Sequence, residues 1–162
     1  DEVALYLNEE LIAKQKPLRN AFSEQLPHPP FVFTLPSFQK GYLRAEGFIK
    51  GKKVSEQIVK SAEQASSIHL HFDESTVKIN PDYPDVVFVY ASVVDANGTI
   101  VSDATPLVEF SLEGENATLI GQNPIAAEAG IATILVRTKN LKKPIKIKAK
   151  STNLKEATLE IK

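Results

Sequence analysis

The sequence predicts an all-β protein built from two β-sandwich domains. Apolar and polar residues alternate with a period of two along most of the 162 residues, as in strands that bury one face. Turn residues separate these stretches at the short spacing typical of sandwiches. No stretch has a sustained period of 3.6 residues, so no helix of ordinary length is expected.

The first half begins with alternating strands on both sides of a proline-rich stretch. Residues 15–30 contain Pro17, Pro27, Pro29 and Pro30 and are expected to form an irregular connection, because proline removes a backbone donor. The expected elements are a strand at 3–7, a turn at 8–10, a strand at 11–14, a helical turn at 20–25, a strand at 31–35, and a hairpin at 41–61 that turns at 50–53.

A small, polar and aperiodic segment, Ser61 to Ser67, separates the two halves. We place the domain boundary there, near residue 66, which gives one domain at 1–66 and a second at 67–162. Asp95-Ala96-Asn97-Gly98 is a turn sequence, since Asn-Gly suits positive φ. The strands expected in the second domain are 68–72, 76–79, 86–95, 107–113, 117–120, 130–138, 145–151 and 157–161.

Composition excludes several classes of function. Nineteen basic and twenty acidic residues nearly cancel, so neither nucleic acid nor an anionic membrane is an expected partner. The absence of cysteine excludes disulfides, thiolate metal sites and thiol nucleophiles. No apolar run reaches the roughly 18 residues of a membrane helix, and no signal peptide stands at the start. A chain without methionine that opens on Asp1 is expected to be a piece of something larger.

Charge is segregated within the second domain. Residues 67–136 carry ten acidic residues and one lysine (1 − 10 = −9), whereas residues 137–162 carry nine basic and two acidic residues (9 − 2 = +7). The favoured interpretation is that late strands pair with earlier ones, so that opposite charges meet across a sheet. The alternative is a basic patch for a polyanion, but the lysines at 142, 143, 146, 148 and 150 lack interleaved aromatic residues.

The sequence offers little to support catalysis. Hydrolysis of a glycoside usually needs two carboxylates about 5 to 10 Å apart. Here Asp82 and Asp85 stand beside proline, Asp95 opens the turn at 95–98, and Asp103 lies between expected strands, so turn chemistry explains them. The glycine-serine elbow of esterases and the glycine-rich phosphate loops are missing. We therefore expect no catalytic residue and no cofactor.

Two histidines, His69 and His71, are spaced to point to one face of a strand, as zinc ligands can. A third ligand is required, and His28 is the remaining histidine. The favoured interpretation is two solvent-facing residues that alternate with buried Ile68, Leu70 and Phe72, so no metal is expected.

Carbohydrate binding by a sandwich usually stacks sugar rings on exposed aromatic residues. The candidates are Tyr6, Tyr42 and Phe48 on the nominally polar strand faces of the first domain, with Tyr83 and Tyr90 comparable in the second. The favoured alternative is that these rings cover a second sheet or an interdomain contact. Tryptophan, the strongest stacking residue, is absent.

Two segments of the first domain carry a family resemblance. Asp1-Glu2-Val3-Ala4-Leu5-Tyr6-Leu7-Asn8 and the hairpin from Leu43 to Val54 resemble the small immunoglobulin-like module that follows the barrel in bacterial family 2 glycoside hydrolases. The sequence departs from that pattern at Glu9, where the family usually has glycine, and in its proline-rich insert. The resemblance also implies that such modules begin one strand earlier, which would leave residues 3–7 without an edge partner.

The second domain resembles the immunoglobulin-like domain that comes next in the same enzymes. The matching segments are 93–98, 108–114, Gly121-Gln122-Asn123-Pro124, 130–132 and 149–151. The cadence is also similar to immunoglobulin-like repeats of bacterial adhesins. The resemblance implies a β-galactosidase-like parent whose glutamates lie in a barrel that this sequence lacks, and no position here matches those glutamates.

The leading hypothesis is therefore two tandem immunoglobulin-like β-sandwiches that form a non-catalytic C-terminal part of a periplasmic or secreted bacterial glycosidase. They would shape the substrate entrance or an oligomer contact, with the upstream catalytic barrel as partner. The alternatives are a carbohydrate-binding module that uses Tyr6, Tyr42 or Phe48, and an adhesin-type surface stalk.

Overall fold

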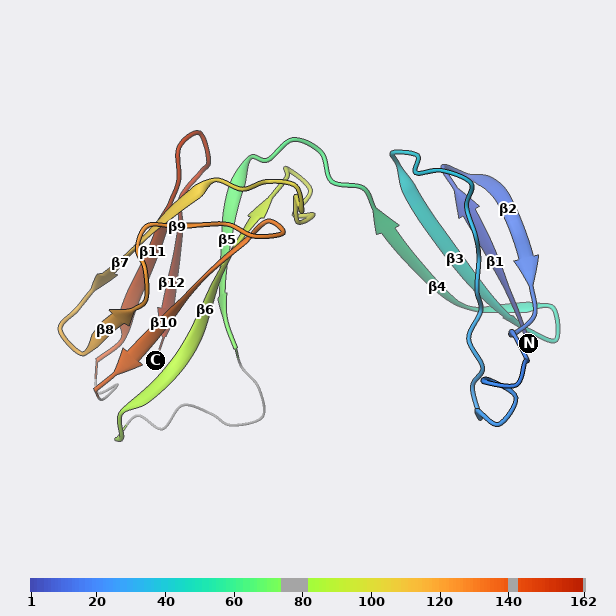
Figure 1. Ribbon diagram of the computed structural model, residues 1–162, viewed down its shortest axis with the longest axis horizontal. Coiled ribbons are helices and arrows are strands. Elements are labelled where there is room, and N and C mark those ends of the chain that lie inside the picture. The colour runs from blue at the N-terminus through green and yellow to red at the C-terminus, as the bar shows by residue number, and fades with distance from the viewer. Residues whose placement is uncertain (74–81, 140–142, 162) are drawn as a thin grey trace. The chain divides into compact units, whose positions relative to one another are not determined.

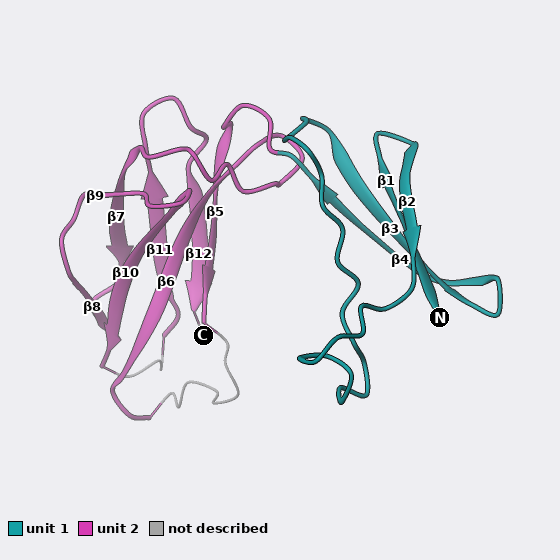
Figure 2. Ribbon diagram, turned by 45° about the vertical axis from the view of Figure 1, so that its right-hand side comes forward, with its two compact units in different colours: residues 1–61 teal, residues 62–162 magenta. Residues whose placement is uncertain are grey.

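A computed structural model describes residues 1–73, 82–139 and 143–161 of the chain. The described residues contain twelve strands and no helix, and all strand pairs within the sheets are antiparallel (Figure 1). The all-β prediction is confirmed. The chain divides into two compact units, unit 1 at Asp1–Ser61 and unit 2 at Ala62–Lys162 (Figure 2).

Unit 1 contains one four-stranded sheet with the order β2-β1-β3-β4. Pairing on both sides of β1 corrects the expectation that residues 3–7 would lack an edge partner, because β2 and β4 form the edges. A tight turn with positive φ closes each of the two hairpins. Asn8 and Glu9 form the turn between β1 and β2, and Lys50 and Gly51 form the turn between β3 and β4. The strands are β1 (Glu2–Leu7), β2 (Glu10–Gln15), β3 (Tyr42–Ile49) and β4 (Lys52–Lys60).

Residues 16–41 of unit 1 contain no strand, so the strand predicted at 31–35 is wrong. Pro29, Pro30 and Pro36 flank that stretch, and each removes a donor that a sheet ladder would need. The predicted helical turn at 20–25 is a single hydrogen-bonded turn, in which Glu24 N–H donates to Asn20 O at 2.9 Å.

Unit 2 is a sandwich of two four-stranded sheets, with the orders β5-β6-β10-β8 and β12-β11-β7-β9. Its core lies between them, where alternate residues such as Val89, Phe110, Ile134 and Ile147 are fully or almost fully buried. The strands are β5 (Ser67–Phe72), β6 (Asp85–Val94), β7 (Leu107–Glu113), β8 (Ala117–Ile120), β9 (Ile125–Ala126), β10 (Ile131–Thr138), β11 (Ile145–Lys150) and β12 (Ala157–Ile161).

Sequence patterns placed the strands of unit 2 closely, with one omission. β9 has two residues, which is too short for a period of two to register. The predicted strand at 76–79 lies outside the described residues. The predicted turn at 95–98 is present, with Gly98 at φ +81°.

Cross-strand ion pairs account for part of the charge segregation in unit 2. Lys150 Nζ lies 3.1 Å from Glu109 Oε2, and Lys148 pairs with Glu113. Both pairs join β11 to β7, which are adjacent strands of one sheet. The interpretation that late basic strands pair with earlier acidic ones is confirmed for these residues.

Candidate functional site

The three aromatic residues predicted to bind carbohydrate, Tyr6, Tyr42 and Phe48, lie on one face of the unit 1 sheet. β1 and β3 pair without a bulge, so that Tyr6 stands opposite Arg44 and Glu2 opposite Phe48. Opposed residues of antiparallel strands point to the same side, as do residues two apart along a strand. We call this side the ring face.

Cations from the same sheet cover two of the three rings. The guanidinium carbon of Arg44 lies 4.1 Å from the centroid of the Tyr6 ring, and Lys14 Nζ lies 4.8 Å from that of Phe48. Both are cation–π distances. Tyr6 and Phe48 are therefore engaged by the protein's own side chains, and carbohydrate binding at the ring face stays a prediction.

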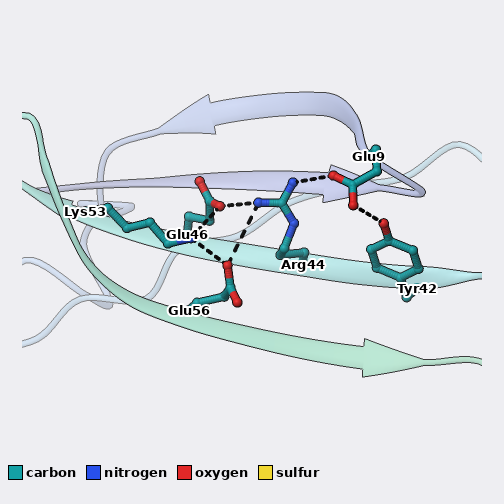
Figure 3. A network of polar contacts seen from close by, with 6 residues as sticks. All are labelled: Glu9, Tyr42, Arg44, Glu46, Lys53 and Glu56. Carbon is teal, nitrogen blue, oxygen red and sulfur yellow. Dashed lines mark hydrogen bonds and ion pairs between the residues drawn. The ribbon is translucent and has the colours of Figure 1, made fainter.

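Arg44 is the centre of a polar network on the ring face, which Figure 3 shows. Its Nη2 lies 2.8 Å from Glu9 Oε2, and its Nη1 pairs with Glu46. Lys53 Nζ lies 2.7 Å from Glu46 Oε1 and 2.5 Å from Glu56 Oε2. The network joins the β1–β2 turn to β3 and β4, so it ties together segments that are far apart in the sequence.

The network shifts the pKa values of its members in the direction that keeps the ion pairs charged. The Tyr42 hydroxyl donates to Glu9, and this bond raises the pKa of Tyr42. The same bond, together with the Arg44 guanidinium, lowers the pKa of Glu9. The hydrogen bond from Lys53 lowers the pKa of Glu46. A general acid needs a raised carboxyl pKa, so these glutamates are suited to holding the sheet rather than to donating a proton.

Glu9 occupies a backbone conformation that explains the glycine usual in the resembling family. Its φ is +71°, in the left-handed region where a side chain is disfavoured. The contacts of its carboxylate with Tyr42 and Arg44 offset that cost. Glutamate at this position therefore has a less favourable backbone conformation than glycine would have, and its carboxylate contacts with Tyr42 and Arg44 stabilise the turn.

A hollow of about 460 Å³ opens beside the sheet of unit 1. Leu7 and Leu43, which stand opposite each other in β1 and β3, contribute to its lining together with Leu35 of the irregular segment. The side chain of Phe38, which is 84% exposed, stands at the hollow with Gln39, Ser37, Val59, Lys60 and Ser61. Apolar lining with a few polar groups is the usual character of small-molecule sites.

Hydrogen bonds fix the rim of this hollow to the sheet. Asn8 Nδ2 donates to Lys40 O at 3.2 Å, and Asn8 Oδ1 accepts from Tyr42 N–H at 3.0 Å. Gly41 N–H donates to Ser61 Oγ at 3.2 Å, while Ser61 N–H donates to Gly41 O at 2.7 Å. These bonds hold residues 40–42 and Ser61 in place at the rim of the hollow.

In unit 2 the two histidines form part of a ladder of stacked rings. The ring centroids of His69 and His71 lie 5.8 Å apart, those of His71 and Tyr90 5.1 Å, and those of Tyr90 and Phe88 6.2 Å. Within residues 1–73, 82–139 and 143–161, no three histidine or acidic side chains gather as a metal site would require. Tyr83, the other predicted aromatic residue, is exposed and lies outside this ladder.

Among the described residues of unit 2, Asp95 is the most fully enclosed carboxylate, at 2% exposure. It accepts backbone N–H bonds from Glu63 at 2.9 Å, Asn97 at 2.8 Å and Thr99 at 2.9 Å. These donors, with the Glu63 bond foremost, lower the pKa of Asp95. Asp95 thus closes its own turn, as the sequence indicated, and also anchors the segment that precedes β5.

Sequence reasoning missed the network around Arg44 and the hollow beside Phe38. Alternation placed Arg44 and Glu46 on one strand face, which was the available signal for the network. Glu9, however, reaches Arg44 from 35 residues away. The hollow depends on the course of an irregular segment, which alternation does not specify.

No helix within the described ranges is long and apolar enough to cross a membrane.

Comparison with protein families matches residues 68–160 to the glycoside hydrolase family 2 C-terminal domain 5. This match takes in all the strands of unit 2 except the ends of β5 and β12.

Relatives with assigned names are similar over most of the chain. A β-galactosidase of Thermoanaerobacter pseudethanolicus is 35% identical over 160 residues, which cover 93% of this chain and 21% of that protein. The β-galactosidase BoGH2A of Bacteroides ovatus is 31% identical over 136 residues, covering 76% of this chain and 16% of that protein. The chain therefore spans about a fifth of the length of these relatives.

A solved structure agrees in fold. A family 2 glycosyl hydrolase from Bacteroides cellulosilyticus has a TM-score of 0.75 and 26% sequence identity, over 99% of this chain and 23% of that one. The family match, the two named relatives and this structure point to the same group of proteins as the sequence resemblance. The chain belongs to glycoside hydrolase family 2 and corresponds to a C-terminal part of its β-galactosidase-like members.

Proposed function

We propose that this chain is a non-catalytic accessory part of a β-galactosidase-like glycoside hydrolase. Its two units serve as immunoglobulin-like modules that pack against the upstream catalytic barrel and shape the substrate entrance or an oligomer contact. The observation that carries the proposal is the match to a C-terminal domain family and to one fifth of a β-galactosidase. The same observation favours this role over an adhesin stalk.

The state of the carboxyl groups supports the absence of catalysis. A glycosidase of the usual kind needs one carboxylic acid whose pKa is raised, beside a second that stays ionised. Where a carboxyl pKa is shifted in the described part of the chain, it is lowered by neighbouring cations, by N–H groups or, for Glu9, first by the Tyr42 hydroxyl. These residues are Glu2, Glu9, Glu46, Asp95 and Glu113.

Exposed apolar side chains support a packing role for unit 1. Phe22 is 93% exposed, and Leu18 and Leu26, four residues before and after it in the sequence, are also exposed. Asn20 organises this turn, because its Oδ1 accepts from Phe22 N–H at 2.9 Å and from Ser23 N–H at 3.1 Å. An ordered turn that presents a phenyl ring to solvent is suited to insertion into a neighbouring surface.

Two measurements test this role. Purified chain 1–162 is expected to show no turnover of p-nitrophenyl β-galactoside, and turnover that a single Glu or Asp substitution abolishes would overturn the proposal. A chimera in which this chain replaces the matching fifth of the Thermoanaerobacter enzyme should retain more activity after heating than the enzyme without that fifth.

Phe22→Ala in the chimera should remove part of that protection, whereas Leu107→Ala, at an exposed position of unit 2, should not. Equal heat sensitivity of the chimera and the truncated enzyme would contradict the packing role.

We also propose a periplasmic or secreted location for the parent enzyme, which fractionation of the source cells tests.

A further inference from the structure

We propose that Asn97, in the turn that follows β6, is a site of spontaneous deamidation to isoaspartate, and that the Asp95 carboxylate controls how fast it reacts. Asparagine is a chemically labile residue, and Asn97 is the one asparagine of the eight in the sequence that glycine follows. Asn97 and Gly98 are both exposed. The reaction uses only atoms of the turn and water, so it requires neither a ligand nor a partner and does not depend on the proposed function.

The reaction exchanges one amide for another within the chain. The backbone nitrogen of Gly98 attacks the side-chain carbonyl carbon of Asn97, Cγ, and the new C–N bond closes a succinimide ring. The bond from Cγ to the side-chain nitrogen breaks, and that nitrogen leaves as ammonia with the proton that Gly98 N gave up. Water then opens the ring at either carbonyl carbon. The product is aspartate or, with the side-chain CH₂ now in the main chain, isoaspartate.

The glycine leaves the attacking nitrogen accessible. A Cβ on the following residue would crowd this nitrogen as it approaches Cγ, and Gly98 has none. The space around it is also open, since a Cβ built on Gly98 would meet no heavy atom within 4 Å beyond its chain neighbours. The asparagines at 8, 20, 116 and 153 precede residues that carry a Cβ, so they are expected to react more slowly.

Asp95 holds the turn in a conformation that opposes the attack. Gly98 N–H donates to Asp95 O at 3.1 Å, so the proton that the reaction removes is engaged in a hydrogen bond. Asp95 Oδ1 accepts from Asn97 N–H at 2.8 Å and from Thr99 N–H at 2.9 Å, the amides on either side of the attacking nitrogen in the sequence. The negative carboxylate there repels the negative charge that Gly98 N must carry to attack. The folded turn therefore protects Asn97.

Deamidation must proceed from an open form of this turn. Closure of the ring requires Gly98 N to come within about 3 to 3.5 Å of Asn97 Cγ. The rotation about the Asn97 Cα–C bond that achieves this breaks the bond from Gly98 N–H to Asp95 O. Exposed turns open locally without global unfolding. Because hydrogen bonds to a charged group are stronger than neutral ones, loss of the Asp95 carboxylate should raise the open fraction, and with it the rate, by about tenfold or more.

The product weakens the turn that slowed its formation. Isoaspartate adds a carbon to the main chain between residues 97 and 98, which displaces Thr99 N–H from Asp95 Oδ1. Asp95 Oδ2 also accepts from Glu63 N–H at 2.9 Å, and this bond ties the segment before β5 to the turn. Conversion of Asn97 therefore loosens this anchor in one irreversible step.

The test is an incubation of chain 1–162 at one fixed pH and temperature, in buffer and in concentrated urea, followed by peptide mapping with isoaspartyl methyltransferase labelling. Isoaspartate should form at 97, about tenfold or more slowly in buffer than in urea. Asp95→Ala should raise the rate in buffer about tenfold or more and leave the rate in urea unchanged. Asp103→Ala, at an exposed position of unit 2, should change neither rate. Gly98→Ala should lower the rate in urea about tenfold or more.

A measurement on the unsubstituted chain keeps the test decisive if Asp95→Ala does not fold. Hydrogen exchange of the Gly98 amide gives the fraction of time for which its bond to Asp95 O is open, and the ratio of the deamidation rates in buffer and urea should match that fraction.

Four results would overturn the proposal. The first two are isoaspartate at 97 that forms no faster in urea than at 116 or 153, and equal rates in buffer and urea. The others are a rate ratio that does not follow Gly98 exchange, and a folded Asp95→Ala variant that reacts no faster than the unsubstituted chain.

Discussion

Replacing Asn123 with alanine tests how the outer edge of unit 2 is completed. β9 pairs with β7 through Leu107↔Ala126 and Val108↔Ile125, but the next residue back, Pro124, has no N–H to continue the ladder. The Asn123 side chain takes over this role: its Oδ1 accepts from Phe110 N–H at 2.9 Å and its Nδ2 donates to Phe110 O at 2.7 Å. Asn123 thereby acts as one more strand residue.

The magnitude follows from these two bonds. A neutral hydrogen bond contributes about 0.5 to 1.5 kcal/mol net, so Asn123→Ala should lower the free energy of unfolding of unit 2 by roughly 1 to 3 kcal/mol. Phe110 is 2% exposed, which places the loss toward the upper end because water reaches the freed groups poorly. For a domain near 100 residues this corresponds to about 5 to 15 °C in Tm.

The assay is scanning calorimetry of chain 1–162, in which each compact unit can give its own transition. The transition of unit 2 should move and that of unit 1 should not. Gln122→Ala changes an exposed neighbour and should cost less than about 0.5 kcal/mol. If Asn123→Ala is as mild as Gln122→Ala, the side chain does not complete the ladder and the reasoning is refuted.

Three further predictions concern other positions. Gly130→Ala should lower the unfolding free energy of unit 2 by about 1 to 3 kcal/mol in urea titration, because φ is +77° and a Cβ would lie 2.4 Å from Val101 O. The lowered pKa of Asp95 adds stability that is present above the ordinary aspartate pKa and is lost as the pH falls through the lowered value. Asp95→Asn should therefore reduce stability at pH 7 and flatten its fall in acid. Glu9→Gln should bring the raised pKa of Tyr42 back toward about 10, measured by phenolate absorbance.

Matched variants separate these effects from nonspecific damage. Gly98→Ala has a similar φ of +81° but open space around the added Cβ, so it should cost less than Gly130→Ala. Asp103→Asn, at an exposed position of unit 2, should change the stability at pH 7 by less than about 0.5 kcal/mol. An equal loss in both glycine variants would show that backbone strain, and not the contact with Val101, sets the cost.

The strands of unit 2 could be predicted because each buries alternate residues against a complete core. Val87, Val89, Ala91 and Val93 in β6 are buried while Phe88 between them is exposed, and the period of two in the sequence records this directly. At residues 31–35 the same alternation predicted a strand that the structure does not contain. Side-chain pattern alone cannot supply a partner strand, and prolines on both sides removed the donors that pairing would need.

The site was less predictable because it depends on contacts between distant residues. The alternation of Tyr42, Arg44 and Glu46 was visible in the sequence, but the turn that brings Glu9 to them depends on positive φ at a residue where glycine was expected. Phe38 lies in an irregular segment, and its place beside Leu7 follows from hydrogen bonds of Asn8 and Ser61. Such contacts become apparent only once the chain is folded.

The exposed edge of unit 1 has a consequence for colloidal behaviour. β4 is nine residues long, all of them exposed, and its outer backbone groups meet no other strand among the described residues. Such an edge, with Val54, Ile58 and Val59 along it, is a template for sheet extension between molecules. Three lysines and one glutamate give the strand a charge of +2, so that two such edges repel each other. Because about 1 M salt shortens the screening length to about 3 Å, light scattering of concentrated chain 1–162 should rise with ionic strength.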